Sequence, residues 1–392
     1  MKIPSRILPV IVFAQFCCTS LWFAGNAVMP DLLNEFSLSP EALGHLTSAV
    51  QFGFIVGTLS FAFLTISDRF SPSRVFFICA VLGALFNLGV LYEDNALMSL
   101  IIFRFLTGFS LAGIYPVGMK IASDYFDKGL GRSLGYLVGA LVLGTAFPHL
   151  LKEISGNIDF EWRSVIYFTS GLAFLGGLAI ILLVPDGPHH KKRTQPDLSL
   201  LFKVFRNQKF RAAAFGYFGH MWELYAFWAF VPVILNFYKN FHSESTFSIP
   251  FISFLIMGLG SLGCISGGYI SEKLGVKRTA GIALLLSGIC CVVSPIIFYA
   301  NSEFLLISFL IFWGLVVVAD SPLFSTLVAQ NASAESRGTA LTFVNCIGFS
   351  ITIFSIQLLN FLSGVLSPAM IFIFLTLGPL LGLITLFRRI VN

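Results

Sequence analysis

Charged residues are scarce in this chain of 392 residues. Only 11% of the residues are Asp, Glu, Lys or Arg, whereas soluble domains carry about 25%. So few charges cannot cover a folded surface of ordinary size with solvated side chains. The chain is 56% hydrophobic and its mean hydropathy is +0.87, so the sequence predicts an all-α protein that crosses a lipid bilayer several times.

Motifs for catalysis and cofactor binding are also missing. The sequence contains no Walker loop, dinucleotide fingerprint, zinc-ligand spacing or nucleophile elbow. We therefore expect no enzymatic activity, no ATP-driven transport, no cofactor and no metal site. The seven cysteines all fall inside apolar runs, so we interpret them as small packing residues and predict no disulfide bond.

Long apolar runs make up most of the chain. A membrane-spanning helix needs about 20 apolar residues, and twelve stretches meet this requirement. The predicted spans are residues 7–33, 42–67, 74–92, 96–120, 131–151, 163–184, 212–237, 249–271, 278–299, 303–329, 338–363 and 368–387.

The basic residues indicate how the chain is oriented. If the N-terminus is cytoplasmic, only Lys152, Arg163 and Lys239 fall on the outer side, and almost all other Lys and Arg residues fall on the inner side. This asymmetry follows the positive-inside rule. We predict a multi-pass protein of the inner (cytoplasmic) membrane with both termini in the cytoplasm. The net charge of +5 is then a result of topology and indicates no nucleic-acid partner.

One long polar segment lies at the midpoint of the chain. It begins with Pro and Gly residues at Pro185 and carries a basic run, which is typical of a linker. We predict an N-terminal six-helix bundle over residues 1–185, a cytoplasmic linker over 186–211 and a C-terminal six-helix bundle over 212–392.

A short charged loop occurs twice between consecutive apolar runs. Residues 268–278 read GYISEKLGVKR, and about 200 residues upstream the segment 68–74 reads DRFSPSR. The return of the same order of charges indicates two homologous halves. The charged residues are Asp68, Arg69 and Arg74 in the first loop and Glu272, Lys273, Lys277 and Arg278 in the second.

These loops resemble the signature G-x-x-x-[DE]-[RK]-x-G-x-[RK]-[RK] of the major facilitator superfamily of transporters, found between helices 2 and 3 and between helices 8 and 9. The second loop matches nearly throughout, while the first departs at Leu64 and Ser71. Arg104 followed by Gly108 resembles the helix-4 signature of the same family. The resemblance implies two pseudo-symmetric six-helix bundles that move a small solute by alternating access. It also implies that the charged loops form a conformational latch.

Only three formal charges fall well inside the predicted spans: Arg104, Glu223 and Asp320. A charged side chain at mid-helix costs roughly 2.5–3.5 kcal/mol in hydrocarbon, so each needs a partner or a water-filled cavity. Arg104 either faces a central cavity, where it binds an anionic group of the substrate, or snorkels to the outer surface. We interpret it as a substrate-binding residue.

His220 and Glu223 lie three residues apart, which places both on one helical face within mutual reach. Such a pair can hold a proton near neutral pH, or it can simply pin this span to a neighbour. Asp320 precedes Pro322, whose ring frees the carbonyl of residue 318. This arrangement suits a proton or cation site, or a purely structural acid. We predict that Glu223, His220 and Asp320 couple transport to protons.

Other polar and aromatic residues of the spans are candidates for lining the cavity, although each one is equally consistent with helix packing. These substrate-binding candidates are Asn26, Gln51, Tyr115, Tyr136, Tyr225, Trp228 and Asn345.

One arginine and two acids inside the membrane favour uptake of a small organic anion or zwitterion together with protons. The fifth predicted span has Pro148 alone, without the Gly-Pro pair usual in efflux antiporters of this family, which also favours uptake. The alternative is a proton-coupled exporter of lipophilic or cationic compounds, which an aromatic-rich cavity would suit. The expected partners of this secondary active transporter are a small-molecule substrate, protons and the bilayer, and we expect a monomer.

Overall fold

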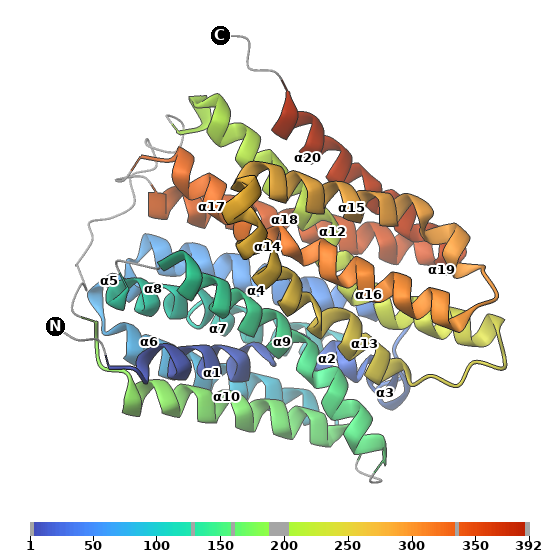
Figure 1. Cartoon of the computed structure of the whole chain (residues 1–392). Coiled ribbons are helices and arrows are strands. Elements are labelled where there is room, and N and C mark those ends of the chain that lie inside the picture. Colours follow the sequence, from blue (N-terminus) through green and yellow to red (C-terminus); the bar gives the residue numbers. More distant parts are fainter. Residues whose placement is uncertain (1–3, 127–129, 158–160, 188–203, 334–336, 389–392) are drawn as a thin grey trace. The chain divides into compact units, whose positions relative to one another are not determined.

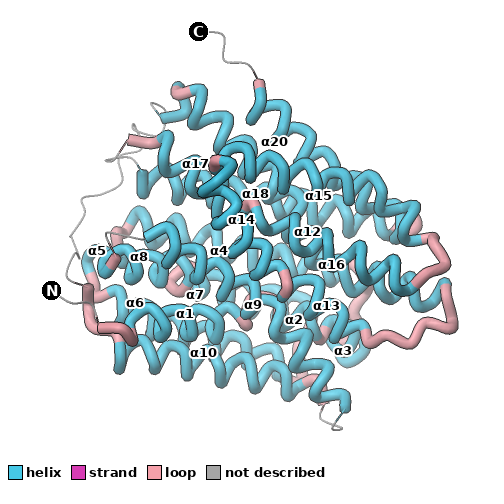
Figure 2. The backbone as a smooth tube through the Cα atoms, in the orientation of Figure 1, coloured by secondary structure: helices cyan, strands magenta, loops and turns pink. Residues whose placement is uncertain are grey.

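The computed structural model describes residues 4–126, 130–157, 161–187, 204–333 and 337–388, and all regular structure in these residues is helical (Figure 2). The chain divides into two compact units, Met1–Pro196 and Asp197–Asn392. This division falls within the predicted linker, of which residues 188–203 lie outside the described part of the chain. Four of the predicted linker residues, 208–211, belong instead to the helix Gln208–Phe241, because the Asn207 side chain caps the backbone N–H groups of Lys209 and Phe210.

The first unit contains the N-terminal helices. They are α1 (Ile7–Thr19), α2 (Ala24–Ala27), α3 (Met29–Glu35), α4 (Ala42–Phe63), α5 (Ile66–Arg69), α6 (Pro72–Leu88), η1 (Gly89–Leu91), α7 (Leu97–Leu111), α8 (Tyr115–Tyr125), α9 (Leu130–Asn157) and α10 (Arg163–Leu183). Within this unit α1 lies beside α10, and α10 lies beside α6 (Figure 1).

The second unit contains the C-terminal helices. They are α12 (Gln208–Phe241), α13 (Ile249–Gly258), α14 (Gly260–Leu274), α15 (Val276–Phe298), α16 (Glu303–Ala319), α17 (Ser321–Asn331), α18 (Arg337–Ser363), α19 (Pro368–Ile371), η2 (Phe372–Thr376) and α20 (Leu377–Phe387). Within this unit α12 packs against both α18 and α20.

Eleven helical stretches of the described residues are long and apolar enough to cross a membrane, and they agree with eleven of the predicted spans to within a few residues. The predicted span 7–33 differs, because it is interrupted. α1 ends at Thr19 and irregular backbone follows before α2. The carbonyl groups of Leu21 and Trp22 in this break accept hydrogen bonds from a buried side chain of another helix, Arg104, instead of from their own helix.

The end of the interrupted span is fixed by ion pairs. Asp31 of α3 lies 2.8 Å from the ammonium of Lys152 on α9, and Glu35 of α3 pairs with Arg163 at the start of α10. Two of the three basic residues that the sequence predicts on the outer side are therefore bound to acids of α3. These pairs tie a helix of only seven residues to α9 and α10.

Close helix packing occurs at equivalent places in the two units. A Cβ atom added at Gly108 of α7 would collide with the Val50 carbonyl of α4, and one added at Gly314 of α16 would collide with the Ile256 carbonyl of α13. Each residue of the second contact lies 206 residues after its counterpart in the first. Small residues allow helix backbones to approach closely within a membrane. The repeated contact supports the duplication that the charged loops indicate.

We expect Gly108→Ala to lower the free energy of unfolding by about 1–3 kcal/mol, because the added methyl group overpacks the crossing of α4 and α7. Gly171→Ala on α10 is the matched control, since no atom lies within 4 Å of a Cβ built there. Thermal unfolding of the purified protein measures both variants. Equal unfolding temperatures for the two would show that this crossing is not tightly packed.

Candidate functional site

Glu223 of α12 is fully buried, and its carboxyl group accepts hydrogen bonds from three neutral donors. The Trp313 indole Nε1 of α16 lies 2.6 Å from Oε1, and the Ser287 hydroxyl of α15 lies 2.8 Å from Oε2. The Cys291 thiol, one turn beyond Ser287, lies 3.4 Å from Oε1. Among the described residues, no cationic side chain forms an ion pair with this carboxyl group. The acid therefore lies in a pocket of donors that carry no charge.

The orientation of Trp313 is set by its aromatic neighbours. Phe227, one turn after Glu223 on α12, stacks on the Trp313 ring with centroids 4.4 Å apart. Phe372 of η2 meets the same ring edge-to-face at 5.8 Å. Since an indole N–H can only donate, this packing directs a fixed donor at the Glu223 carboxyl group.

His220 pairs with Asp320 and not with Glu223. Its Nδ1 lies 2.8 Å from Oδ1 of Asp320, and both side chains are 1% exposed. Three residues along an α-helix rotate a side chain by about 300°, which leaves two side chains about 60° apart. On α12 this offset directs His220 toward the end of α16 and Glu223 toward Ser287 and Trp313. The predicted mutual contact of His220 and Glu223 is therefore replaced by two separate contacts.

Asp320 lies at a helix break, as the sequence predicts. α16 ends at Ala319, and α17 begins at Ser321 with Pro322 in its first turn. The Val318 carbonyl, which Pro322 leaves without its helical donor, accepts from the Cys264 thiol of α14 at 3.4 Å. Oδ2 of Asp320 and Nε2 of His220 are buried without a hydrogen-bond partner among the described residues. The pair thus retains unused capacity for a proton or a polar ligand.

Arg104 of α7 is buried and binds the interrupted first span. Its Nη2 donates to the Trp22 carbonyl at 2.6 Å and to the Leu21 carbonyl at 3.2 Å, and its Nη1 donates to the Leu21 carbonyl and to Asn87 Oδ1, each at 3.2 Å. The two carbonyls follow the C-terminal end of α1, where the helix dipole favours a cation. No acid forms an ion pair with Arg104 among the described residues.

Asn87 extends this network from α6 to α10. It is fully buried, and its Nδ2 donates to Ser170 Oγ at 2.9 Å and to Thr169 Oγ1 at 3.1 Å. Arg104 and Asn87 together link the break after α1 to α6, α7 and α10. These contacts account for the burial of the arginine and show that it does not snorkel to the surface.

The other predicted substrate-binding residues of the first unit have varied surroundings. Asn26 of α2 donates to Thr47 Oγ1 of α4 at 2.8 Å. Gln51 of α4 is fully buried, and its amide has no hydrogen-bond partner among the described residues. Tyr115 on α8 and Tyr136 on α9 are half-buried. Gln51 thus differs from Asn26 in having buried polar atoms without a hydrogen-bond partner among the described residues.

The candidates of the second unit belong to an aromatic cluster. The ring of Tyr225 on α12 lies 5.4 Å from that of Trp228 and 5.3 Å from that of Phe349 on α18, between centroids. Tyr225 and Trp228 are buried, whereas Asn345, one turn before Phe349, is half-buried. The cluster therefore joins α12 to α18.

The first charged loop contacts the end of α10. The Ser71 hydroxyl caps α6 and lies 2.7 Å from Oδ1 of Asp186, and Ser73 donates to the Val184 carbonyl at 2.7 Å. Arg69 and Arg74 are exposed, and the side chain of Asp68 lies outside the described part of the structure.

The second charged loop turns at Gly275, whose φ of +85° strongly favours glycine. Glu272, Lys273 and Arg278 are exposed, and none of them forms an ion pair among the described residues. Lys277 differs, because its ammonium lies over the Phe387 ring of α20 at 5.4 Å from the centroid.

Sequence reasoning missed the residues that surround Glu223 and Arg104. Trp313, Ser287 and Cys291 lie in other spans, and no spacing rule connects them to Glu223. Asn87 gave a usable signal, since it is the one amide side chain within the predicted span 74–92. A lone amide in an apolar span needs a hydrogen-bond partner.

The profile of the Major Facilitator Superfamily matches residues 11–356. The uncharacterized MFS-type transporter YceJ of Bacillus subtilis is 23% identical, over 87% of this chain and 85% of its own. The benzoate transport protein of Acinetobacter baylyi is 23% identical, over 45% of this chain and 38% of its own. The probable galactarate/D-glucarate transporter GudP of Escherichia coli is 21% identical, over 86% of this chain and 83% of its own.

Among solved structures, the nucleoside transporter NupG superposes with a TM-score of 0.74 at 15% identity, over 97% of this chain and 99% of its own. At this identity the likeness concerns the fold alone. The family profile, by contrast, covers most of the chain. This protein therefore belongs to the major facilitator superfamily, and it is a multi-pass membrane secondary transporter and not an enzyme.

Proposed function

We propose that this transporter takes up a small organic anion together with protons. Two of the relatives are named for transport of benzoate and of galactarate or D-glucarate, which are carboxylates. An N-terminal and a C-terminal six-helix bundle would expose the site alternately to the two sides of the membrane, with the charged loops as a latch. The N-terminal bundle would provide positive charge and the C-terminal bundle the proton sites.

The observation that carries this proposal is the set of neutral donors around Glu223. Trp313, Ser287 and Cys291 can stabilise a carboxylate, but they do not fix its charge as a cation would. The Ser287 hydroxyl also lies 3.1 Å from the Leu284 carbonyl, so it has a second acceptor. When Glu223 takes a proton, this hydroxyl can turn to Leu284 and accept from the carboxylic acid. Both protonation states therefore have hydrogen-bond partners in the same pocket.

The His220 and Asp320 pair would form a second protonation site. The pair lies at the break between α16 and α17. Helix breaks in transporters expose backbone groups where binding and coupling sites form. A proton taken by this pair would change the net charge at a position where α16 and α17 can bend.

Arg104 would attract the anionic group of the substrate. Its hydrogen bonds hold the break between α1 and α2, while no acid neutralises its charge among the described residues. Gln51 and Asn26 would add amide contacts in the first unit. Tyr115, Tyr136, Tyr225, Trp228 and Asn345 would complete the site with mixed polar and aromatic surfaces, as is usual for small-molecule sites.

We propose further that the protein works as a monomer with both termini in the cytoplasm. Single cysteines placed at Tyr92 and at Lys192, which lies outside the described residues, would report their sides of the membrane to an impermeant thiol reagent in intact cells. The seven native cysteines are buried and give little background. Labelling of Tyr92→Cys alone supports this orientation, and labelling of both positions contradicts it.

The cargo and the direction of transport can be tested together. Thermal stabilisation of the purified protein by a panel of carboxylates, sugars, amino acids and lipophilic cations selects the best binder. Its uptake is then measured in proteoliposomes with and without an inward proton gradient. We expect a carboxylate to bind best and to accumulate only with the gradient. Binding of lipophilic cations, with transport driven against the proton gradient, would support the exporter instead.

A further inference from the structure

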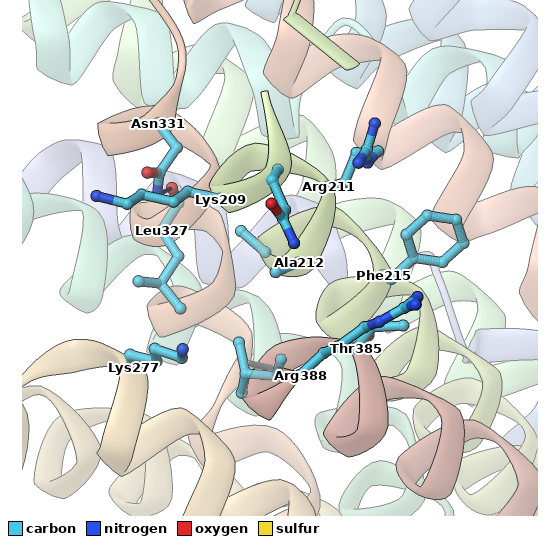
Figure 3. Close-up of a pocket in the computed structure, with 12 residues that line it drawn as sticks. Lys209, Arg211, Ala212, Phe215, Lys277, Leu327, Asn331, Thr385 and Arg388 are labelled. Atoms are coloured by element: carbon cyan, nitrogen blue, oxygen red, sulfur yellow. Dashed lines mark hydrogen bonds between the residues drawn. The ribbon is translucent and has the colours of Figure 1, made fainter. Parts of the chain in front are cut away.

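A pocket of about 300 Å³ opens where α12 begins and α20 ends (Figure 3). Its lining comes from α12, α15, α17 and the residues at the end of α20, all in the second unit. Four basic residues line it: Lys209, Arg211, Lys277 and Arg388. None of the described residues that line the pocket is acidic. Within the described part of the chain, the lining of the pocket is therefore positively charged.

Contacts between the four helices hold the pocket in shape. The Asn207 side chain at the start of α12 donates to the Asn331 carbonyl at the end of α17 at 3.1 Å. Gly281 of α15 leaves room for the Phe387 ring of α20, which brings the first turn of α15 beside the end of α20. As a result, Lys277 and Arg388 line the same pocket although they lie far apart in the sequence.

The pocket is amphipathic. Gln208, Asn331 and Thr385 add neutral polar groups to the basic side chains, while Phe215, Leu327 and Leu386 supply an apolar part. Ligand sites usually measure about 300–1,000 Å³, so this volume suits a small group such as a phosphate ester. Basic pockets between membrane helices on the cytoplasmic side favour anionic lipid headgroups. Under the proposed orientation the pocket lies on the cytoplasmic side, where the positive-inside rule requires basic residues but does not gather them around one cavity.

We propose that this pocket binds the phosphate group of an anionic phospholipid. The basic side chains and the polar residues would bind the phosphate oxygens, and the apolar residues would contact the start of the acyl chains. Because Lys277 belongs to the second charged loop, the bound headgroup would touch that loop directly. This inference concerns a site apart from Glu223 and Arg104, and it does not depend on the cargo or on proton coupling.

The test is a lipid titration of the delipidated full-length protein, followed by native mass spectrometry. Phosphatidylglycerol is compared with phosphatidylcholine of the same acyl chains. We expect the anionic lipid to bind more tightly to the wild-type protein. Each removed charge should weaken its binding about fivefold, so Lys277→Gln with Arg388→Gln should weaken it roughly 25-fold. A competition arm with inorganic phosphate shows whether a free phosphate can occupy the same pocket.

The matched control is Lys273→Gln with Arg278→Gln, which removes the same charge from the same loop region but outside the pocket. It should retain phosphatidylglycerol binding within about twofold of wild type. Equal losses in the two double variants, or full retention in the pocket variant, would overturn the proposal. Thermal unfolding in phosphatidylcholine shows whether each variant is folded, and Arg211→Gln provides a second pocket variant with a single change.

Discussion

Glu223→Gln is expected to lower proton-driven uptake at least about tenfold while leaving substrate exchange close to wild type. Glutamine has nearly the shape of a protonated glutamate but cannot release a proton. Its amide oxygen can accept from Trp313, and its amide nitrogen can donate to the Ser287 hydroxyl, which then turns to the Leu284 carbonyl. The variant should therefore fold and exchange cargo, but it should not use a proton gradient.

Counterflow and gradient-driven uptake in the same proteoliposomes separate these two effects. The matched control is Glu303→Gln at the start of α16, a carboxyl group that accepts from the Thr246 N–H far from the donors of Glu223. It should keep both activities. Unchanged gradient-driven uptake by Glu223→Gln would remove Glu223 from the coupling mechanism, and loss of exchange as well would point to a structural role for the carboxyl group.

Arg104→Met is expected to lower the free energy of unfolding by about 3 kcal/mol or more, because it leaves the Leu21 and Trp22 carbonyls and Asn87 Oδ1 without their donor. Each buried acceptor that loses its partner costs about 1–3 kcal/mol. Binding of an anionic substrate should be lost together with the charge. Arg104→Lys keeps the charge but not the planar set of donors. It should therefore retain part of the anion binding, but its free energy of unfolding should still be lower than that of the wild type.

A double-mutant cycle with Asn87→Leu tests the network directly. Arg104 and Asn87 share a hydrogen bond, so the cost of both changes together should be smaller than the sum of the single costs. Additive costs would show that the two residues act independently. Equal effects of Arg104→Lys on anionic and neutral ligands would show that the arginine is purely structural.

The apolar runs predicted the helices well because a membrane span has a nearly fixed length and composition. Pro116 and Pro322 mark the breaks that divide α7 from α8 and α16 from α17. The break after Thr19 carries no proline, and it depends on Arg104, which lies more than 80 residues further along the chain. Such a break cannot be read from local sequence.

The site was only partly predictable for a similar reason. The cost of a charge in hydrocarbon identified Arg104, Glu223 and Asp320 as residues that need partners. Helical spacing indicated that His220 and Glu223 share one side of α12, but it did not specify which neighbouring helix each would meet. Packing decides that His220 meets Asp320 and that Glu223 meets Trp313.

The central claim is that uptake of the substrate is coupled to protons carried by the buried acids of the second unit. The most direct measurement is the internal pH of proteoliposomes, which a trapped dye reports. The carboxylate that binds best is added outside, without a pH gradient. The account predicts acidification of the lumen with wild-type protein and none with Glu223→Gln or with protein-free vesicles. Uptake of the carboxylate by wild-type protein without any change of internal pH would contradict it.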